Sequence, residues 1–182
     1  MSLGKRIFQI LVLVAFLFSG GMFLWQALLS NPHLLPLARL NQPLPVFSAP
    51  SLFKPDQKIT EQAFKGRATL LNIFATWCMP CQLEQPVLMD IHQHYSIPIM
   101  GVLYKDQPEN GLQWLKQRGN PYVAVMLDPE GKLGMDLGVY GTPETYLIDQ
   151  NGIIRYRHIG TLSMDDWQRE FVPLIEQGSH TK

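Results

Sequence analysis

Two cysteines in a Cys-Met-Pro-Cys motif are the residues of this 182-residue chain best suited to chemistry. Cys78 and Cys81 are its only cysteines, with an apolar run at 68–75 before the motif and a helix-forming run at 82–91 after it. A strand leading into a helix here would place Cys78 at the helix N-terminus, where unpaired N–H groups and the helix dipole stabilise a thiolate. Cys81, one turn further in, would be shielded and able to attack a mixed disulfide formed at Cys78. The pattern predicts a redox-active Cys78–Cys81 pair.

Three other uses of the two cysteines are weaker. A structural zinc site usually needs four ligands, and neither a second C-x-x-C motif nor a paired histidine follows. A purely structural disulfide across so short a loop would remove little chain entropy. A copper site could recruit Met79, His92 or His94, but both histidines lie far along the expected helix. We therefore expect no metal and no cofactor.

Charge excludes one class of partner, and the N-terminal region indicates another. Fifteen basic and fifteen acidic residues cancel, so no strong field favours nucleic acid. Residues 7–29 contain no charge and are long enough to cross a bilayer as a helix. Lys5 and Arg6 precede the stretch and Trp25 lies near its far end. This arrangement predicts a cytoplasmic N-terminus at 1–6 and a transmembrane signal anchor at 7–29.

The anchor sets the expected domain organisation and redox compartment. A cleavable signal peptide is the alternative, but its apolar region is normally shorter, and 27–30 match a cleavage site poorly. The proline-rich residues 30–50 are expected to form a linker, whose last part lies along the core, to a domain at 51–178. That domain would lie outside the membrane, on the side where disulfides form.

The remaining pattern predicts an α/β domain with a mixed central sheet flanked by helices. Apolar runs predict buried strands at 68–76, 97–104 and 122–128, and an Asn-Gly turn predicts a hairpin of 145–149 with 153–158. Helices are expected at 82–95, at 108–118, over a short stretch at 131–139, and after a capping box at 163–166. Asn72 interrupts the first strand; it is either a hydrogen-bonded core amide or a group that tunes the cysteines from below.

This arrangement resembles the thioredoxin fold with a short helical insertion. Trp77 before the first cysteine and Pro86 five residues after the second both match the thioredoxin pattern. The resemblance implies a cis-proline beside the cysteines, for which Pro143 is the candidate. It would hold the backbone of Thr142 ready to pair with an extended substrate. An ordinary trans proline that opens a strand is the alternative.

Four stretches narrow the resemblance to the DsbE/CcmG family of membrane-anchored periplasmic proteins of cytochrome c maturation. These stretches are 71–78, 119–122, 137–145 and 151–158. Asn72 also fits this family, since general thioredoxins carry a buried acid at its position. The Met79-Pro80 pair is a departure from the Pro-Thr pair of enterobacterial members. The redox potential of those members therefore cannot be assumed for this chain.

The resemblance implies a protein-disulfide reductase. Cys78 would be the nucleophile and Cys81 the resolving thiol. The substrate would be the cysteine pair of apocytochrome c, reached directly or through an intermediary thiol protein, before haem attachment. A membrane electron donor of the DsbD/CcdA kind would keep the pair reduced. Glu84 and Glu144 lie near the motif and could handle protons or select a basic partner; a solvated surface charge is the other interpretation, and the favoured one for Glu84.

Other functions remain open at this stage. A general disulfide oxidase or isomerase is disfavoured, because the single helix between the central strands leaves no room for the helical domain that such oxidases carry. A peroxidase is disfavoured by the Trp-Cys-x-x-Cys context. A non-catalytic module that binds a metal or haem within an assembly complex is the remaining alternative.

Overall fold

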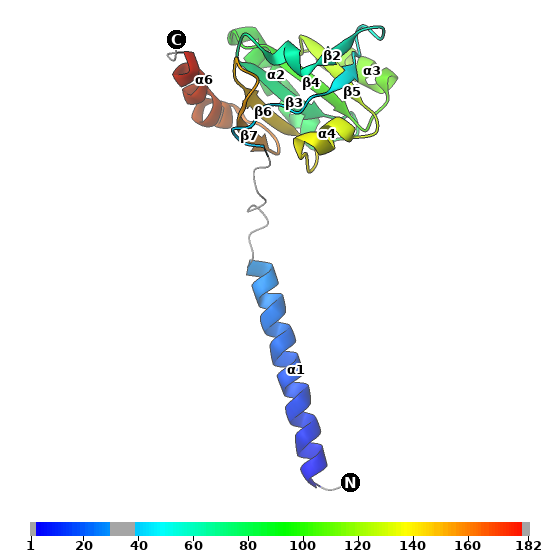
Figure 1. Ribbon diagram of the computed structural model, residues 1–182. Coiled ribbons are helices and arrows are strands. Elements are labelled where there is room, and N and C mark those ends of the chain that lie inside the picture. Colours follow the sequence, from blue (N-terminus) through cyan, green and yellow to red (C-terminus); the bar gives the residue numbers. More distant parts are fainter. Residues whose placement is uncertain (1–2, 30–38, 180–182) are drawn as a thin grey trace. The chain divides into compact units, whose positions relative to one another are not determined.

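The computed structural model describes residues 3–29 and 39–179, which belong to two compact units, Met1–Pro36 and Leu37–Lys182 (Figure 1). In the first unit the described element is the helix α1 (Leu3–Leu29). Across the described parts of both units, no helix is both long enough and apolar enough to cross a membrane. The transmembrane anchor thus stays a prediction from the sequence.

The second unit is built on a mixed five-stranded sheet, as predicted. Its strands are β3 (Thr69–Phe74), β4 (Ile99–Tyr104), β5 (Ala124–Asp128), β6 (Glu144–Ile148) and β7 (Ile154–Ile159). They lie in the order β5-β4-β3-β6-β7 (Figure 1). β3 pairs parallel to β4 and antiparallel to β6, and the hairpin of β6 and β7 is antiparallel.

Helices and short elements cover both faces of this sheet. The helical elements are η2 (Glu61–Phe64), α2 (Met79–His94), α3 (Pro108–Arg118), α4 (Lys132–Leu137), α5 (Met164–Asp166), η3 (Trp167–Phe171) and α6 (Val172–Ser179). A separate antiparallel pair joins β1 (Ser48–Pro50) to β2 (Lys58–Thr60). The fold is thioredoxin-like.

The alternation of side chains along β3 divides the core into two clusters. Leu70 and Phe74 point to the face covered by α2, α3 and η3. Leu71 and Ile73 point to the opposite face, with α4, η2 and the N-terminal segment of the domain. β3 is buried throughout, because it is a central strand with helical cover on both sides. Asn72 shares the face of Leu70 and Phe74, which directs it toward α2.

One region confirms the pattern that the sequence predicts, and another differs from it. The last part of the expected linker, residues 39–50, packs on the domain: Leu44 is buried, and the N–H of Asn41 donates to the carbonyl of Ile154 at 2.8 Å. Residues 30–38 of the linker lie outside the described residues. The expected single C-terminal helix contains the π-helical turn η3 between α5 and α6. Such turns form where an extra residue is accommodated in a helix.

Candidate active site

Cys78 and Cys81 form a disulfide at the start of α2, with an S–S distance of 2.05 Å. Cys78 is the N-cap residue, and its Sγ accepts a hydrogen bond from the backbone N–H of Cys81 at 3.1 Å. Pro80 lies in the first turn, where a missing N–H costs no intrahelical bond. Both cysteines are buried in this oxidised state. The predicted placement of the pair at the end of β3 and the beginning of α2 is confirmed.

Two contacts fix the loop that carries the motif. The exposed indole of Trp77 donates through Nε1 to the carbonyl of Lys105 at 3.1 Å. The backbone N–H and the hydroxyl of Thr76 both donate to Asp106 Oδ2, at 2.7 and 2.6 Å. Burial would raise the pKa of Asp106, but these bonds, with those from Asn110 of α3 and from its N-cap residue Gln107, outweigh it and lower that pKa. The loop before the cysteines is therefore tied to the loop after β4.

Thr142 and Pro143 lie at the same end of the sheet as the cysteines. The Thr142–Pro143 peptide bond is cis, as predicted. Ile73 of β3 pairs with Glu144 of β6, so Pro143 lies beside the end of β3 from which the loop to Cys78 begins. The Thr142 hydroxyl oxygen is buried and has no hydrogen-bond partner among the described residues.

Asn72 is the centre of a buried hydrogen-bond network beneath the motif. Its Nδ2 donates to Glu84 Oε1 at 2.9 Å and to the hydroxyl of Thr145 at 3.0 Å. Its Oδ1 accepts from the hydroxyl of Tyr122 at 2.7 Å. The interpretation as a hydrogen-bonded core amide is confirmed, and through Glu84 the same amide reaches the helix that carries Cys81.

Glu84 is a buried acid one turn after Cys81 on α2. Only 1% of it is exposed, so the surface-charge interpretation favoured from its residue type is wrong. Its Oε2 accepts from the N–H of Leu162 at 3.0 Å and its Oε1 from Asn72. Burial raises the pKa of Glu84 to about 7, although both hydrogen bonds act to lower it. Residues three apart on a helix share a face, so this carboxyl lies on the side of α2 that carries Cys81.

Glu144 is also buried, with 1% exposed, and it belongs to an internal ion pair. Arg157 Nη2 lies 2.7 Å from Glu144 Oε2, and the guanidinium contacts both carboxylate oxygens. The N–H of Tyr140 and the hydroxyl of Tyr146 also donate to this carboxylate. The interpretation of Glu144 as a solvated surface charge is therefore wrong. The carboxylate instead ties the segment before Pro143 to β7.

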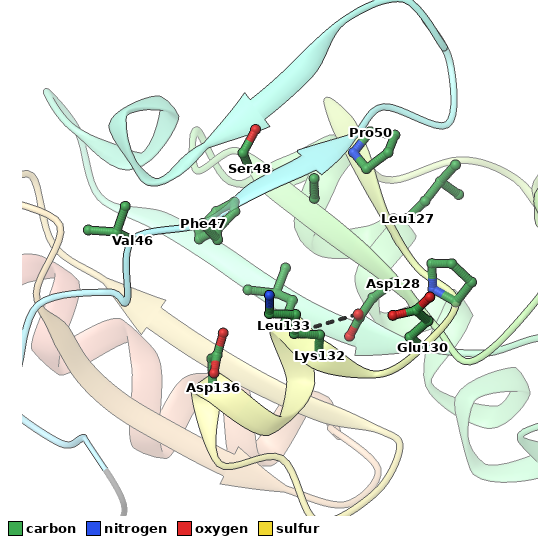
Figure 2. Close-up of a pocket in the computed structure, with 12 residues that line it drawn as sticks. Val46, Phe47, Ser48, Pro50, Leu127, Asp128, Glu130, Lys132, Leu133 and Asp136 are labelled. Atoms are coloured by element: carbon green, nitrogen blue, oxygen red, sulfur yellow. Dashed lines mark hydrogen bonds between the residues drawn. The ribbon is translucent and has the colours of Figure 1, made fainter.

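One well-defined hollow of the domain lies away from the disulfide. This cavity has a volume of about 530 Å³. It lies between residues 46–50 and the end of β5 with α4 (Figure 2). Asp128, at its floor, accepts from the N–H groups of Leu133 and Gly134 and so holds the start of α4. A smaller hollow of about 370 Å³ includes Lys105 and Tyr140, which adjoin the site through Trp77 and Glu144.

The geometry weakens the copper alternative. His92 and His94 lie in the last turn of α2, whereas the cysteines are at its beginning. Along a helix of this length the two ends are more than about 15 Å apart. Within the described residues, no three or more histidine, cysteine or acidic side chains form a group able to hold a metal ion.

Sequence reasoning missed four members of the site. Tyr122, Asp106, Thr145 and Arg157 each supply hydrogen bonds to the residues above. Two of them carried a usable signal: Asp106 lies two residues after the predicted second strand, and Arg157 lies in the predicted hairpin. Their partners lie far away in the sequence, so neither local pattern identifies them.

Comparisons with known proteins agree with this architecture. A family model described as Redoxin matches residues 39–169. A thiol:disulfide interchange protein DsbE from Pseudomonas aeruginosa is 39% identical over 173 residues, which cover 95% of each chain. Another DsbE, from Escherichia coli strain K12, is 41% identical over 180 residues, 96% of this chain and 97% of that relative.

The fold also has solved counterparts. A secreted thiol-disulfide isomerase from Corynebacterium glutamicum is similar with a TM-score of 0.65 and 21% identity, over 73% of this chain and 85% of that one. At this identity the likeness shows the shared fold alone.

Proposed function

Because the chain belongs to the DsbE family of thiol:disulfide interchange proteins and is a thiol–disulfide oxidoreductase, we propose that it acts as a periplasmic reductant of protein disulfides. One observation carries the proposal. The Cys78–Cys81 pair lies at a helix N-terminus with the buried carboxyl of Glu84 one turn beyond Cys81. This arrangement joins a site that stabilises a thiolate to a group that can take a proton near neutral pH.

In the proposed reaction, the Cys78 thiolate attacks one sulfur of the substrate disulfide. A Cys78–substrate bond forms while the substrate S–S bond breaks, and the first substrate thiolate leaves. Cys81 then loses its proton to Glu84 and attacks Cys78 Sγ. The Cys78–Cys81 disulfide forms, and the second substrate sulfur leaves as a thiolate. Two electrons pass to the substrate, which is reduced, and the chain is left oxidised.

Other residues would position the substrate. Trp77 is 59% exposed beside the motif and offers an apolar surface. The backbone of Thr142, before the cis peptide bond, would pair with an extended segment that carries the substrate cysteines. Asn72 and Glu144 would act through other residues: Asn72 orients Glu84, and Glu144 holds the segment that leads to Pro143.

We propose the cysteine pair of apocytochrome c as substrate, reached directly or through an intermediary thiol protein before haem attachment. A membrane electron donor of the DsbD/CcdA kind would reduce the pair again. This choice follows from the family resemblance of residues 137–145 and 151–158.

The membrane anchor at 7–29 belongs to the same proposal and rests on the sequence, with its uncharged stretch behind Lys5 and Arg6. It would hold the domain in the periplasm as a single-pass inner-membrane protein. If so, the protein should remain in the membrane fraction after extraction with alkaline carbonate. Release into the soluble fraction would contradict the proposed anchor but would leave the proposed disulfide chemistry unaffected.

The equilibrium reduction potential of the Cys78–Cys81 couple in the full chain tests the direction of the reaction. A value of roughly −200 to −270 mV supports a reductant that must be supplied with electrons. A value near roughly −120 mV would favour a general oxidase instead.

A Cys81→Ser variant tests the division of roles between the cysteines. It should accumulate a mixed disulfide through Cys78 with a peptide that contains an oxidised Cys-x-x-Cys-His segment. Cys78→Ser is the matched control and should trap nothing. If Cys81→Ser traps no mixed disulfide and cytochrome c maturation still proceeds, the result would support a non-catalytic module.

A further inference from the structure

His158 of β7 pairs with Glu170 and lies one peptide group away from the buried carboxyl of Glu84. His158 Nδ1 is 2.9 Å from Glu170 Oε2, and His158 Nε2 is 3.3 Å from the carbonyl oxygen of Thr161. Both ring nitrogens therefore face acceptors. A neutral imidazole carries one N–H and can donate to only one of them, whereas the imidazolium donates to both. The geometry suits a protonated ring.

The carbonyl of Thr161 and the N–H of Leu162 belong to one peptide group. On its carbonyl side this group faces His158 Nε2, and on its N–H side it donates to Glu84 Oε2 at 3.0 Å. A cation at the carbonyl polarises the peptide and strengthens the N–H as a donor, because hydrogen bonds in a chain reinforce each other. A single peptide group thus joins a partly exposed histidine to a carboxyl that is 1% exposed.

We propose that His158 is a positioning residue for Glu84, acting through the Thr161–Leu162 peptide group to favour the ionised carboxylate. The proposal rests on the proposed function in one respect: Glu84 receives the proton of Cys81. Its consequence is that a side chain near the surface helps to set the pH at which the resolving step proceeds. The positive charge of His158 also acts on Glu84 directly and lowers its pKa, against the larger effect of burial.

The charged groups around His158 support this arrangement. The carboxylate of Glu170 has two basic partners. Arg169 Nη2 donates to its Oε1 at 2.7 Å, and His158 Nδ1 lies 2.9 Å from its Oε2. Arg169 also contacts Asp166. Tyr156 faces the same carboxylate; burial, and then its hydrogen bond to Glu170, raise the pKa of this tyrosine to about 12. Glu170 therefore remains an anion held between two cations when His158 is protonated.

The test is a pH titration of the Glu84 carboxyl by ¹³C NMR, in the oxidised full chain in detergent micelles, with Glu84→Gln to assign the signal. His158→Gln removes the cation and should raise the titration midpoint by about half a pH unit. His158→Lys should return the midpoint toward the wild-type value. His94→Gln is the matched control, because His94 pairs with Asp90 on the exposed surface of α2, and it should leave the midpoint unchanged.

Two outcomes would overturn the proposal. One is a His158→Gln midpoint equal to that of the His94→Gln control. The other is a Leu162 amide chemical shift in His158→Gln that equals the shift in the His94→Gln control, because a link through the Thr161–Leu162 peptide group must change that amide.

The titration uses no substrate, so it is independent of the reductase assay. If the midpoint moves while the pH profile of disulfide reduction does not, the role of Glu84 in the proposed function fails and the link to His158 stands.

Discussion

At Glu84, burial and hydrogen bonding act on one carboxyl group in opposite directions. Burial penalises the charged form, while the bonds from Leu162 and Asn72 favour it, and the outcome is a pKa of about 7. The folded chain therefore keeps a proton on Glu84 at pH values where the unfolded chain, with its ordinary pKa of 4.5, has released it. This contribution to stability is complete below pH 4.5 and is lost as the pH rises through 7.

A Glu84→Gln variant should remove this pH dependence. Relative to the variant, the free energy of unfolding of the wild type should fall by about 3 kcal/mol between pH 4.5 and 7. Urea denaturation of both proteins at several pH values, in the oxidised state, measures the difference. Acids with lowered pKa, such as Asp106 and Asp149, affect both proteins equally and cancel. A difference that stays constant with pH would contradict the raised pKa.

The buried ion pair of Glu144 and Arg157 makes a second prediction. Arg157→Met would leave the carboxylate buried without its cation and should cost about 3–5 kcal/mol. Arg155, on the same strand, pairs with Asp149 but is 44% exposed. Arg155→Met should therefore cost less than about 1 kcal/mol. Urea denaturation at pH 7 compares the two, and equal costs would show that Glu144 finds another partner.

At the scale of the elements, local pattern predicts the strand–loop–helix unit well. β3 is apolar on both faces, and Pro80 marks the first turn of α2, so the position of Cys78 follows from neighbouring residues. The burial of Glu84 does not follow, because its two partners lie 12 and 78 residues away along the chain. The packing of the end of the linker is expected from the sequence, but its partners are not: a proline-rich stretch without periodicity does not indicate the backbone bonds to 152–154 that hold residues 41–44.

The capping box at the start of α5 is predicted from the sequence and is present in the structure. The N–H of Asp166 donates to the Ser163 hydroxyl, and the N–H of Ser163 donates to Asp166 Oδ2, both at 3.1 Å. Ser163→Ala should lower the free energy of unfolding by about 1 kcal/mol. Ser48→Ala, at an exposed position in β1, is the control and should have little effect. Thermal unfolding followed by circular dichroism measures both, and equal melting temperatures would mean that packing of Trp167 alone holds the helix start.

For the whole molecule, the boundary of the folded unit determines which residues its stability depends on. The second unit begins at Leu37, well before the domain start of 51 expected from the sequence. Between these points the chain adds to the edge of the sheet: the N–H of Leu44 donates to the carbonyl of Gly152 at 2.9 Å, and the N–H of Ile154 donates to the carbonyl of Gln42 at 2.9 Å. Leu44 itself is buried against the core.

Two truncations separate these contributions. Removal of residues 1–36 should leave the unfolding free energy of the domain unchanged, because the described backbone bonds to residues 152–154 come from residues 41–44. Removal of residues 1–46 also deletes Leu44 and its backbone bonds, and should cost about 3 kcal/mol from lost apolar burial and hydrogen bonding. Urea denaturation of the two truncated proteins at pH 7 gives the difference directly. Equal stability would mean that residues 37–46 lie on the domain without stabilising it, and the folded unit would then begin near β1.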